Sequence, residues 1–255
     1  MTAIFRWILS RFRPRQLDDA ECECREIRTL LIDPCAQDEP TGPAAAGYPV
    51  ERIRKALARM QRAQTKAELL AFLGQEIELF DLHDIEKMNA CFTRKVAFLP
   101  EHYRERLLGK VREQIFGAHH RLLLVARNGY EDGSPLHPAF PSYCAMVAAA
   151  CTEKAREKDP RPLYLKYLLA AFTMFVLEEP AHPVGTPFPG GQIVDVWEGQ
   201  YLCPVREQAG DVPFALCPYC PAVQSAIPTF PESRAAREES RRRECLANYW
   251  TNYKG

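Results

Sequence analysis

Three cysteines near the C-terminus, Cys203, Cys217 and Cys220, are each followed directly by proline. Proline fixes its own φ and lacks a backbone N–H, so each thiol is placed where the chain bends. Cys217 and Cys220 also form a Cys-x-x-Cys turn, which brings two thiolates within reach of one metal ion. The pattern therefore predicts a short segment whose fold is held by a thiolate-bound metal.

Zinc is the metal that this pattern favours, because thiolates on short turns meet its demand for four tetrahedral ligands without a large core. The three Cys-Pro cysteines supply three ligands. His182 lies upstream in a stretch rich in proline and glycine, and it is the first choice for the fourth ligand. Cys245 is the second choice, followed by one of Cys22, Cys24 or Cys35 folding back.

Three other interpretations compete with a zinc site. An iron–sulfur cluster is the nearest, because Cys-Pro also follows cluster ligands, although clusters usually draw closely grouped cysteines. A redox dithiol at Cys217 and Cys220 is weaker, since such motifs normally open a helix and the adjacent prolines would resist a helical start. Packing as small apolar side chains is the remaining interpretation. It is favoured for Cys91, Cys144 and Cys151, which lie in apolar helical segments.

Length and charge exclude several classes of protein. The chain has 255 residues, and its 33 basic residues balance 33 acidic ones, so no global field recruits nucleic acid. Several of its ten cysteines lie in apolar helical segments, which predicts a reducing cytoplasm rather than a secreted disulfide scaffold. The longest apolar run, Leu163 to Leu177, contains Lys166 and is shorter than the roughly 20 residues of a bilayer-spanning helix. A buried core helix is expected there.

Residues 1–49 are predicted to form an N-terminal arm and linker. Ile4, Phe5 and Ile8 share a helical face beside several arginines, a pattern also seen in interfacial helices, so membrane contact through this arm is an alternative. A flexible or partner-docked arm is favoured over it. The stretch before Val50 is rich in proline, alanine and glycine, which is typical of a linker.

From Val50 onward the apolar residues recur every three or four positions, which predicts helices. Thr65 and Glu68 form a capping-box signature, and Pro100 and Gly129 mark the start and end of a long helix. The predicted helices cover residues 50–80 (two helices), 101–128, 142–157 and 161–179.

A β-hairpin is predicted after the helices. Two short strands are expected, Ile193–Trp197 and Tyr201–Leu202, joined by a tight turn at Glu198-Gly199-Gln200. Cys203 directly follows the second strand. The preceding loop, residues 182–191, is interpreted as a rigid turn that seats the hairpin on the helices. We therefore expect a mainly α, bundle-like domain with a small C-terminal hairpin and a metal-binding loop. The domain spans residues 50–231, its hairpin and cysteine-rich part covers about 180–224, and residues 232–255 form a charged helix or tail.

The motifs from His182 to Cys220 resemble an uncharacterised protein family of methanogenic archaea, a domain of unknown function. They are His-Pro-Val-Gly-Thr-Pro-Phe-Pro-Gly-Gly, then Tyr-Leu-Cys-Pro-Val, then Ala-Leu-Cys-Pro-Tyr-Cys. The resemblance covers most of the region from about Val50 to Gln224. It implies a methanogen source and a cytoplasmic setting, and it supplies no activity or substrate.

These observations favour a zinc-binding cytoplasmic protein that acts as a binding or assembly module for a protein partner. The first alternative is a metal-dependent enzyme with an open zinc position and His182 or Glu179 as acid–base group. The second is an iron–sulfur redox protein. No nucleic-acid partner is expected.

Overall fold

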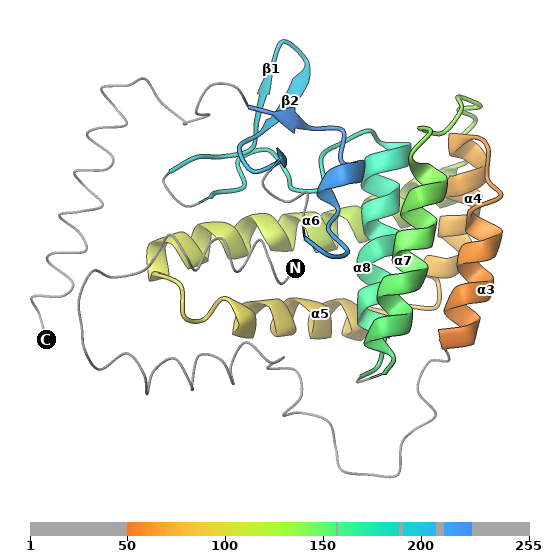
Figure 1. Cartoon of the computed structure of the whole chain (residues 1–255), viewed down its shortest axis with the longest axis horizontal. Coiled ribbons are helices and arrows are strands. Elements are labelled where there is room, and N and C mark those ends of the chain that lie inside the picture. The colour runs from red at the N-terminus through yellow and green to blue at the C-terminus, as the bar shows by residue number, and fades with distance from the viewer. Residues whose placement is uncertain (1–49, 157, 189–190, 208–211, 226–255) are drawn as a thin grey trace, which may run out of the picture.

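The computed structural model describes residues 50–156, 158–188, 191–207 and 212–225. The predicted arm and tail, with Cys22, Cys24, Cys35 and Cys245, lie outside these ranges. Within them the chain forms six α-helices and a small three-stranded sheet, so the mainly helical fold is confirmed (Figure 1). The helices are α3 (Val50–Met60), α4 (Lys66–Ile77), α5 (Leu82–Lys95), α6 (Glu101–Asn128), α7 (Phe140–Lys154) and α8 (Arg161–Ala171).

The helices pack around one large apolar core. Helix α3 packs on α7, α7 on α8, and α4 on α6, while α5 runs beside the first part of α6 and extends away from the group (Figure 1). The α5–α6 pair has its own smaller apolar cluster near the connection between the two helices. Fully buried large side chains of the main core are Ile53, Leu69, Leu73, Leu122, Tyr143, Tyr164 and Phe172.

The N-terminus of α4 is capped from two sides. As predicted, the Thr65 hydroxyl oxygen accepts a hydrogen bond from the Glu68 N–H, at 3.2 Å. The N–H groups of the first two helical residues donate to the carbonyl oxygens of Ser134 and Asp132, both at 3.0 Å. The free donors of this helix end are therefore satisfied, and the loop after α6 is tied to the start of α4.

Helix α6 begins and ends where the sequence predicts, whereas α5 was not predicted. Pro100 precedes the first residue of α6, and Gly129 ends it with φ 79°, a conformation that suits glycine. The sequence interpretation contained no helix between residues 81 and 99. The signal was present, because Asp81 and Asp84 form a complete capping box, but many polar residues of α5 obscure its apolar spacing.

Helix α8 passes into a π-helical turn, η2 (Phe172–Val176), instead of continuing as one α-helix to residue 179. The Leu177 N–H donates to the Phe172 carbonyl oxygen at 3.1 Å, which closes the wider turn. The chain then changes direction at Glu178, whose φ is 55°. No helix among the described residues is long and apolar enough to span a membrane.

The sheet has the strand order β1-β2-β3 and lies on one side of the helices (Figure 1). Strands β1 and β2 are antiparallel, with Trp197 opposite Gln200, so the predicted hairpin is confirmed. The third strand was not predicted; it pairs in parallel with β2 and places Cys203 opposite Gln224. The strands are β1 (Asp195–Trp197), β2 (Gln200–Cys203) and β3 (Val223–Gln224).

The hairpin turn consists of two residues, Glu198 and Gly199, both with positive φ (48° and 78°). Positive φ at both central positions is the signature of a type I′ turn, whose twist matches that of paired strands. Glycine takes this conformation readily, and Glu198 is held in it by the pairing on either side. The turn therefore fixes the register that places Cys203 at the inner end of β2.

Candidate functional site

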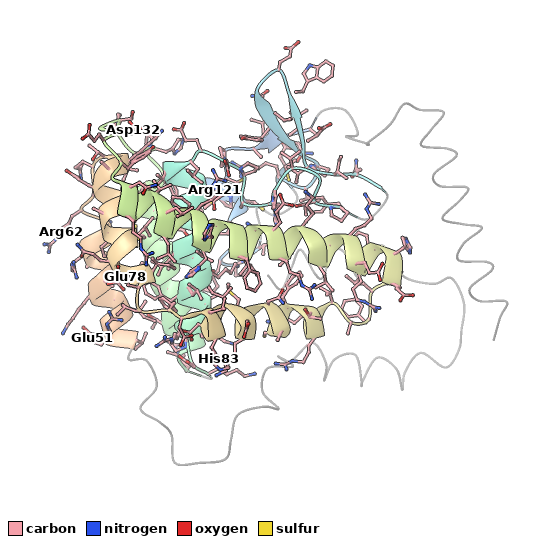
Figure 2. The ribbon with its side chains drawn as sticks, turned by 180° about the vertical axis from the view of Figure 1, so that it is seen from behind. Glu51, Arg62, Glu78, His83, Arg121 and Asp132 are labelled. Carbon is pink, nitrogen blue, oxygen red and sulfur yellow. The ribbon has the colours of Figure 1, made fainter. Side chains whose placement is uncertain are left out.

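The segment between the π-helical turn and the sheet is held to both the helices and the cysteine loop. Arg121 of α6 donates two hydrogen bonds to the carboxylate of Glu179, at 2.8 and 2.9 Å, and lies on the side of α6 that faces the sheet (Figure 2). The Gln114 side-chain amide donates to the Ala181 carbonyl oxygen. The Ala181 N–H in turn donates to the Cys220 sulfur at 3.3 Å. Ala181 thus connects α6 to Cys220 through its carbonyl and its N–H.

His182 follows Ala181 and starts the loop that leads to the sheet. It is half-buried, and its ring meets the ring of Phe188 edge to face, with the centroids 5.9 Å apart. The Tyr103 hydroxyl of α6 donates to the Pro187 carbonyl oxygen at 3.1 Å, and the Gly185 N–H donates to the carbonyl oxygen of the residue before β1 at 2.8 Å. As predicted, the loop seats the hairpin on the helical body.

The three Cys-Pro cysteines approach the same junction from two segments. Cys203 ends β2, whereas Cys217 begins a short 3₁₀ turn and Cys220 follows it. All three are free thiols; Cys203 and Cys217 are buried and Cys220 is half-buried. The apolar cluster under the sheet contains Cys203, and Cys220 packs against that cluster and against the helical core.

The thiols also influence one another electrostatically. Burial raises the pKa of Cys203 to about 11, and the neighbouring Cys217 and Cys220 add to this rise, while a hydrogen bond from the Val205 backbone opposes it. Burial likewise raises the pKa of Cys217, with Cys220 as the next cause. A second thiolate is therefore unfavourable here unless a positive charge accompanies it, and a bound divalent cation would supply such a charge.

The 3₁₀ turn that carries Cys217 is docked on the helices through aromatic residues. The Tyr219 ring contacts the Tyr143 ring of α7 edge to face, with centroids 5.4 Å apart, and the Tyr167 hydroxyl donates to the Phe214 carbonyl oxygen at 3.1 Å. The expectation that the prolines resist a helical start is wrong for Pro218. Pro218 is the second residue of this 3₁₀ turn, where a backbone N–H has no partner within the turn, so the missing N–H costs no hydrogen bond.

The predicted ligands meet at this junction without forming a ligand group. Throughout the described ranges, no three His, Cys, Asp or Glu side chains are arranged so that they could hold a metal ion. Glu179, the suggested acid–base group, is bound by Arg121 on both carboxylate oxygens. Cys144 and Cys151 are buried in the helical core, as predicted. Cys91 is half-buried and disulfide-bonded, so its interpretation as a free thiol packed in the core was wrong.

The sequence did not predict that Lys166 would influence the titration of His182. It lies on α8, where its Nζ is 4.9 Å from the centroid of the Tyr167 ring. Burial lowers the pKa of Lys166 to about 8, and its electrostatic neighbours include Cys217. Loss of solvation lowers the pKa of His182 to about 4, with the charge of Lys166 as the next cause, so this imidazole is neutral near pH 7. The signal in the sequence was a lysine inside an otherwise apolar run.

The comparison with protein families gives a clear result for most of this chain. The model described as "Uncharacterized protein conserved in archaea (DUF2115)" matches residues 65–225, which include α4 to α8, the sheet and the cysteine junction. This chain belongs to the DUF2115 family. The family assignment confirms the resemblance that was inferred from the motifs between His182 and Cys220.

Relatives of this DUF2115 member occur in methanogens. A UPF0305 protein of Methanothermobacter thermautotrophicus is 27% identical over 167 residues, which are 63% of this chain and 96% of the relative. A UPF0305 protein of Methanopyrus kandleri is 35% identical over 130 residues, 49% of this chain and 86% of the relative. A further UPF0305 match in M. thermautotrophicus is 46% identical over 61 residues, where the chain spans 39% of the relative. No solved structure matches this chain.

Proposed function

We propose that this protein is a zinc-binding assembly module in which one metal ion fastens the three-stranded sheet to the helical body. The observation that supports this proposal most is that three free cysteines from two segments lie near one another where the sheet meets the helices. Two of their sulfurs accept backbone hydrogen bonds, Cys203 from Val205 and Cys220 from Ala181. Hydrogen bonds to sulfur stabilise the thiolate form, which is the form that binds metal.

The proposal requires a small closing movement, because the junction contains no formed ligand group in the described part of the chain. Zinc holds each thiolate at about 2.3 Å, so Cys217 and Cys220 would have to close on Cys203 around the ion. His182, neutral near pH 7, is the proposed fourth ligand. Binding would then contribute free energy to folding, because the ligand group forms only in the folded chain.

The hairpin supports a binding role rather than catalysis. Val196 and Trp197 of β1 are 45% and 67% exposed. They lie at the turn end of the hairpin, whereas Cys203 lies at its other end. A closed metal site at the inner end would hold these apolar side chains in a fixed position for a protein partner. The balanced net charge supports no nucleic-acid partner. The cytoplasmic setting stays a prediction.

An enzyme with an open zinc position is the second candidate. It is favoured by the half-buried, neutral His182, which would serve as a base if it did not bind the metal. Glu179 is a poor candidate for this role because Arg121 occupies its carboxylate. Cobalt substitution separates the two functions: four protein ligands with no exchangeable position support the assembly module, and an exchangeable ligand supports the enzyme.

The decisive experiment is elemental analysis of the full chain purified anaerobically, for the wild type and for Cys203→Ser, Cys217→Ser and Cys220→Ser. We expect one zinc per wild-type chain and its loss from each variant. The matched control is Cys144→Ala, which removes a buried thiol of the helical core and should retain the metal. Iron in place of zinc would support the iron–sulfur alternative. A wild type without metal would overturn the proposal.

A further inference from the structure

The backbone of the 3₁₀ turn places Cys217 and Cys220 side by side. The turn is closed by the Cys220 N–H, which donates to the Cys217 carbonyl oxygen at 3.2 Å. Side chains three residues apart are eclipsed in a 3₁₀ helix, and the rise of about 2 Å per residue puts their Cα atoms about 6 Å apart. Disulfides usually join Cα atoms about 4.4–6.8 Å apart. Both thiols are free, and the turn holds them at a spacing that a disulfide can bridge.

The turn is held from two sides, so this spacing is set before any reaction. On the side of the helices, the Tyr219 hydroxyl donates to the Ser142 carbonyl oxygen of α7 at 3.3 Å. On the side of the sheet, the Arg206 guanidinium donates to the carbonyl oxygens of Ala222 at 2.8 Å and Pro218 at 3.5 Å. Groups that are held in one geometry react with each other much faster than groups that must meet by diffusion. The turn is therefore preorganised for closure into a disulfide.

The two thiols differ in their access to solvent. Cys217 is buried, whereas Cys220 is half-buried and the prolines on either side of it, Pro218 and Pro221, are exposed. The Ala181 N–H donates to the Cys220 sulfur at 3.3 Å, and such a hydrogen bond stabilises the negative charge of an attacking thiolate. Cys220 is thus placed to attack an incoming disulfide, and Cys217 is placed behind it.

We propose that Cys217 and Cys220 form a redox-active dithiol that exchanges with low-molecular-weight disulfides. The Cys220 thiolate attacks one sulfur of the incoming disulfide, and the first small thiol leaves with the electron pair of the broken S–S bond and takes up a proton. The Cys217 thiolate then attacks the Cys220 sulfur, and the second small thiol leaves in the same way. The protein dithiol is oxidised and the small disulfide is reduced to two thiols. An excess of the small thiol reverses both steps.

This inference goes beyond the proposed zinc site and does not rest on it. A thiolate that is bound to a metal is not free to attack a disulfide, so the exchange belongs to the metal-free chain. Closure of the disulfide removes two of the proposed zinc ligands. The same turn would then respond both to metal and to the redox state of small thiols.

The test uses the full chain, reduced and stripped of metal with a chelator, and then incubated with oxidised glutathione. The protein is alkylated and digested with trypsin. Cys217 and Cys220 share the tryptic peptide 207–234, whereas Cys203 lies in the peptide that ends at Arg206. We expect the 207–234 peptide to lose both alkylation sites and to be lighter by two hydrogens than its reduced form, and reduced glutathione to reverse the change. A disulfide that links Cys203 to this peptide would overturn the inference.

Three variants separate the two steps. Cys217→Ser should stop at a mixed disulfide between Cys220 and glutathione, because the second thiol is absent. Cys220→Ser should react about tenfold or more slowly, because the remaining thiol of the turn is buried. Cys144→Ala, which removes a buried thiol of the helical core, is the matched control and should react like the wild type.

The outcomes distinguish this inference from the proposed function. A wild type that binds zinc but keeps both thiols of the turn reduced when it is metal-free would overturn the inference and leave the zinc site intact. A wild type that is purified without zinc and still closes the disulfide would overturn the proposed function and support the inference.

Discussion

Arg121 and Glu179 join the C-terminal half of α6 to the segment that precedes the sheet through two parallel hydrogen bonds of 2.8 and 2.9 Å. Single ion pairs between partly exposed side chains contribute little, but a bidentate arginine–carboxylate pair also fixes orientation. Ala181 lies two residues beyond Glu179 and donates its N–H to the Cys220 sulfur. The pair therefore positions the backbone donor of one proposed metal ligand.

Arg121→Met should loosen this connection without unfolding the protein. We expect amide hydrogen exchange at Ala181 to become faster, while the global free energy of unfolding falls by no more than about 1 kcal/mol. Hydrogen exchange followed by mass spectrometry or NMR measures the first effect, and denaturant titration the second. Arg127→Met, an exposed change near the end of the same helix, should leave the exchange rate at Ala181 unchanged. An Ala181 exchange rate equal to that of the wild type would show that the pair has no positioning role.

Gly74 is predicted to be intolerant of any side chain because α4 and α6 pack closely at this point. A Cβ at Gly74 would lie 2.8 Å from the Cβ of Ala126, which is far inside van der Waals contact. We expect Gly74→Ala to destabilise the protein by about 1–3 kcal/mol through overpacking, more than the roughly 1 kcal/mol that alanine gains in helix propensity.

The matched control for Gly74 is Gly109 of α6. It is exposed, and no described atom lies within 4 Å of a Cβ built there. Gly109→Ala should therefore stabilise the protein by up to about 1 kcal/mol. Thermal or urea unfolding of both variants decides the matter. Destabilisation of similar size in both would rule out the packing explanation and point to an effect on the helices alone.

The sequence predicted those elements whose ends carry local signals. The Thr65 cap, the limits of α6 at Pro100 and Gly129, and the hairpin turn all depend on contacts within a few residues. Helix α5 was missed even though its Asp81 capping box is equally local, because its polar residues hide the apolar spacing. Local signals therefore predict most elements, and for α5 that signal is its capping box rather than its apolar periodicity.

The candidate site was predictable only as a set of residue types. The Cys-Pro repeats indicated that Cys203, Cys217 and Cys220 share a region, and the structure brings them to one junction. The short parallel strand β3 depends on contacts between segments far apart in the chain, because it pairs with β2 across the cysteine loop. No local pattern encodes such contacts, so they could not be derived from the spacing of residues.

Asp132 is predicted to make stability depend on pH in the acid range. Hydrogen bonds from the Ser134 hydroxyl and N–H lower the pKa of this carboxyl to about 2, with smaller contributions from Tyr130 and Lys66. Because the folded pKa lies below the ordinary value of 3.8, the stabilisation is present above about pH 4 and is lost as the pH falls toward 2. Asp132→Asn should therefore be less stable than the wild type at pH 6, and the difference should shrink below pH 3.

Unfolding by urea at several pH values, together with NMR titration of the carboxyl group, measures both parts of the Asp132 prediction. Glu131→Gln removes one charge from the neighbouring exposed position and is the matched control, which should show no such convergence. A wild-type titration midpoint near 4 for Asp132 would contradict the hydrogen-bonded arrangement of this loop. Because the loop carbonyls cap α4, faster amide exchange at the start of α4 should accompany the substitution.

Removal of metal should act on the sheet before it acts on the helices. If zinc fastens Cys203 at the end of β2 to the Cys217–Cys220 turn, a strong chelator removes the link between the hairpin and the body. Hydrogen exchange should then increase across residues 195–203, while α3, α4 and α7 keep their protection because the buried residues of their core come almost entirely from the helices. Cys217→Ser should show the fast hairpin exchange without chelator, and addition of chelator should not increase it further. Equal exchange across residues 195–203 in zinc-loaded and chelated protein would mean that the helices alone hold the sheet, and the cysteines would then be explained by packing.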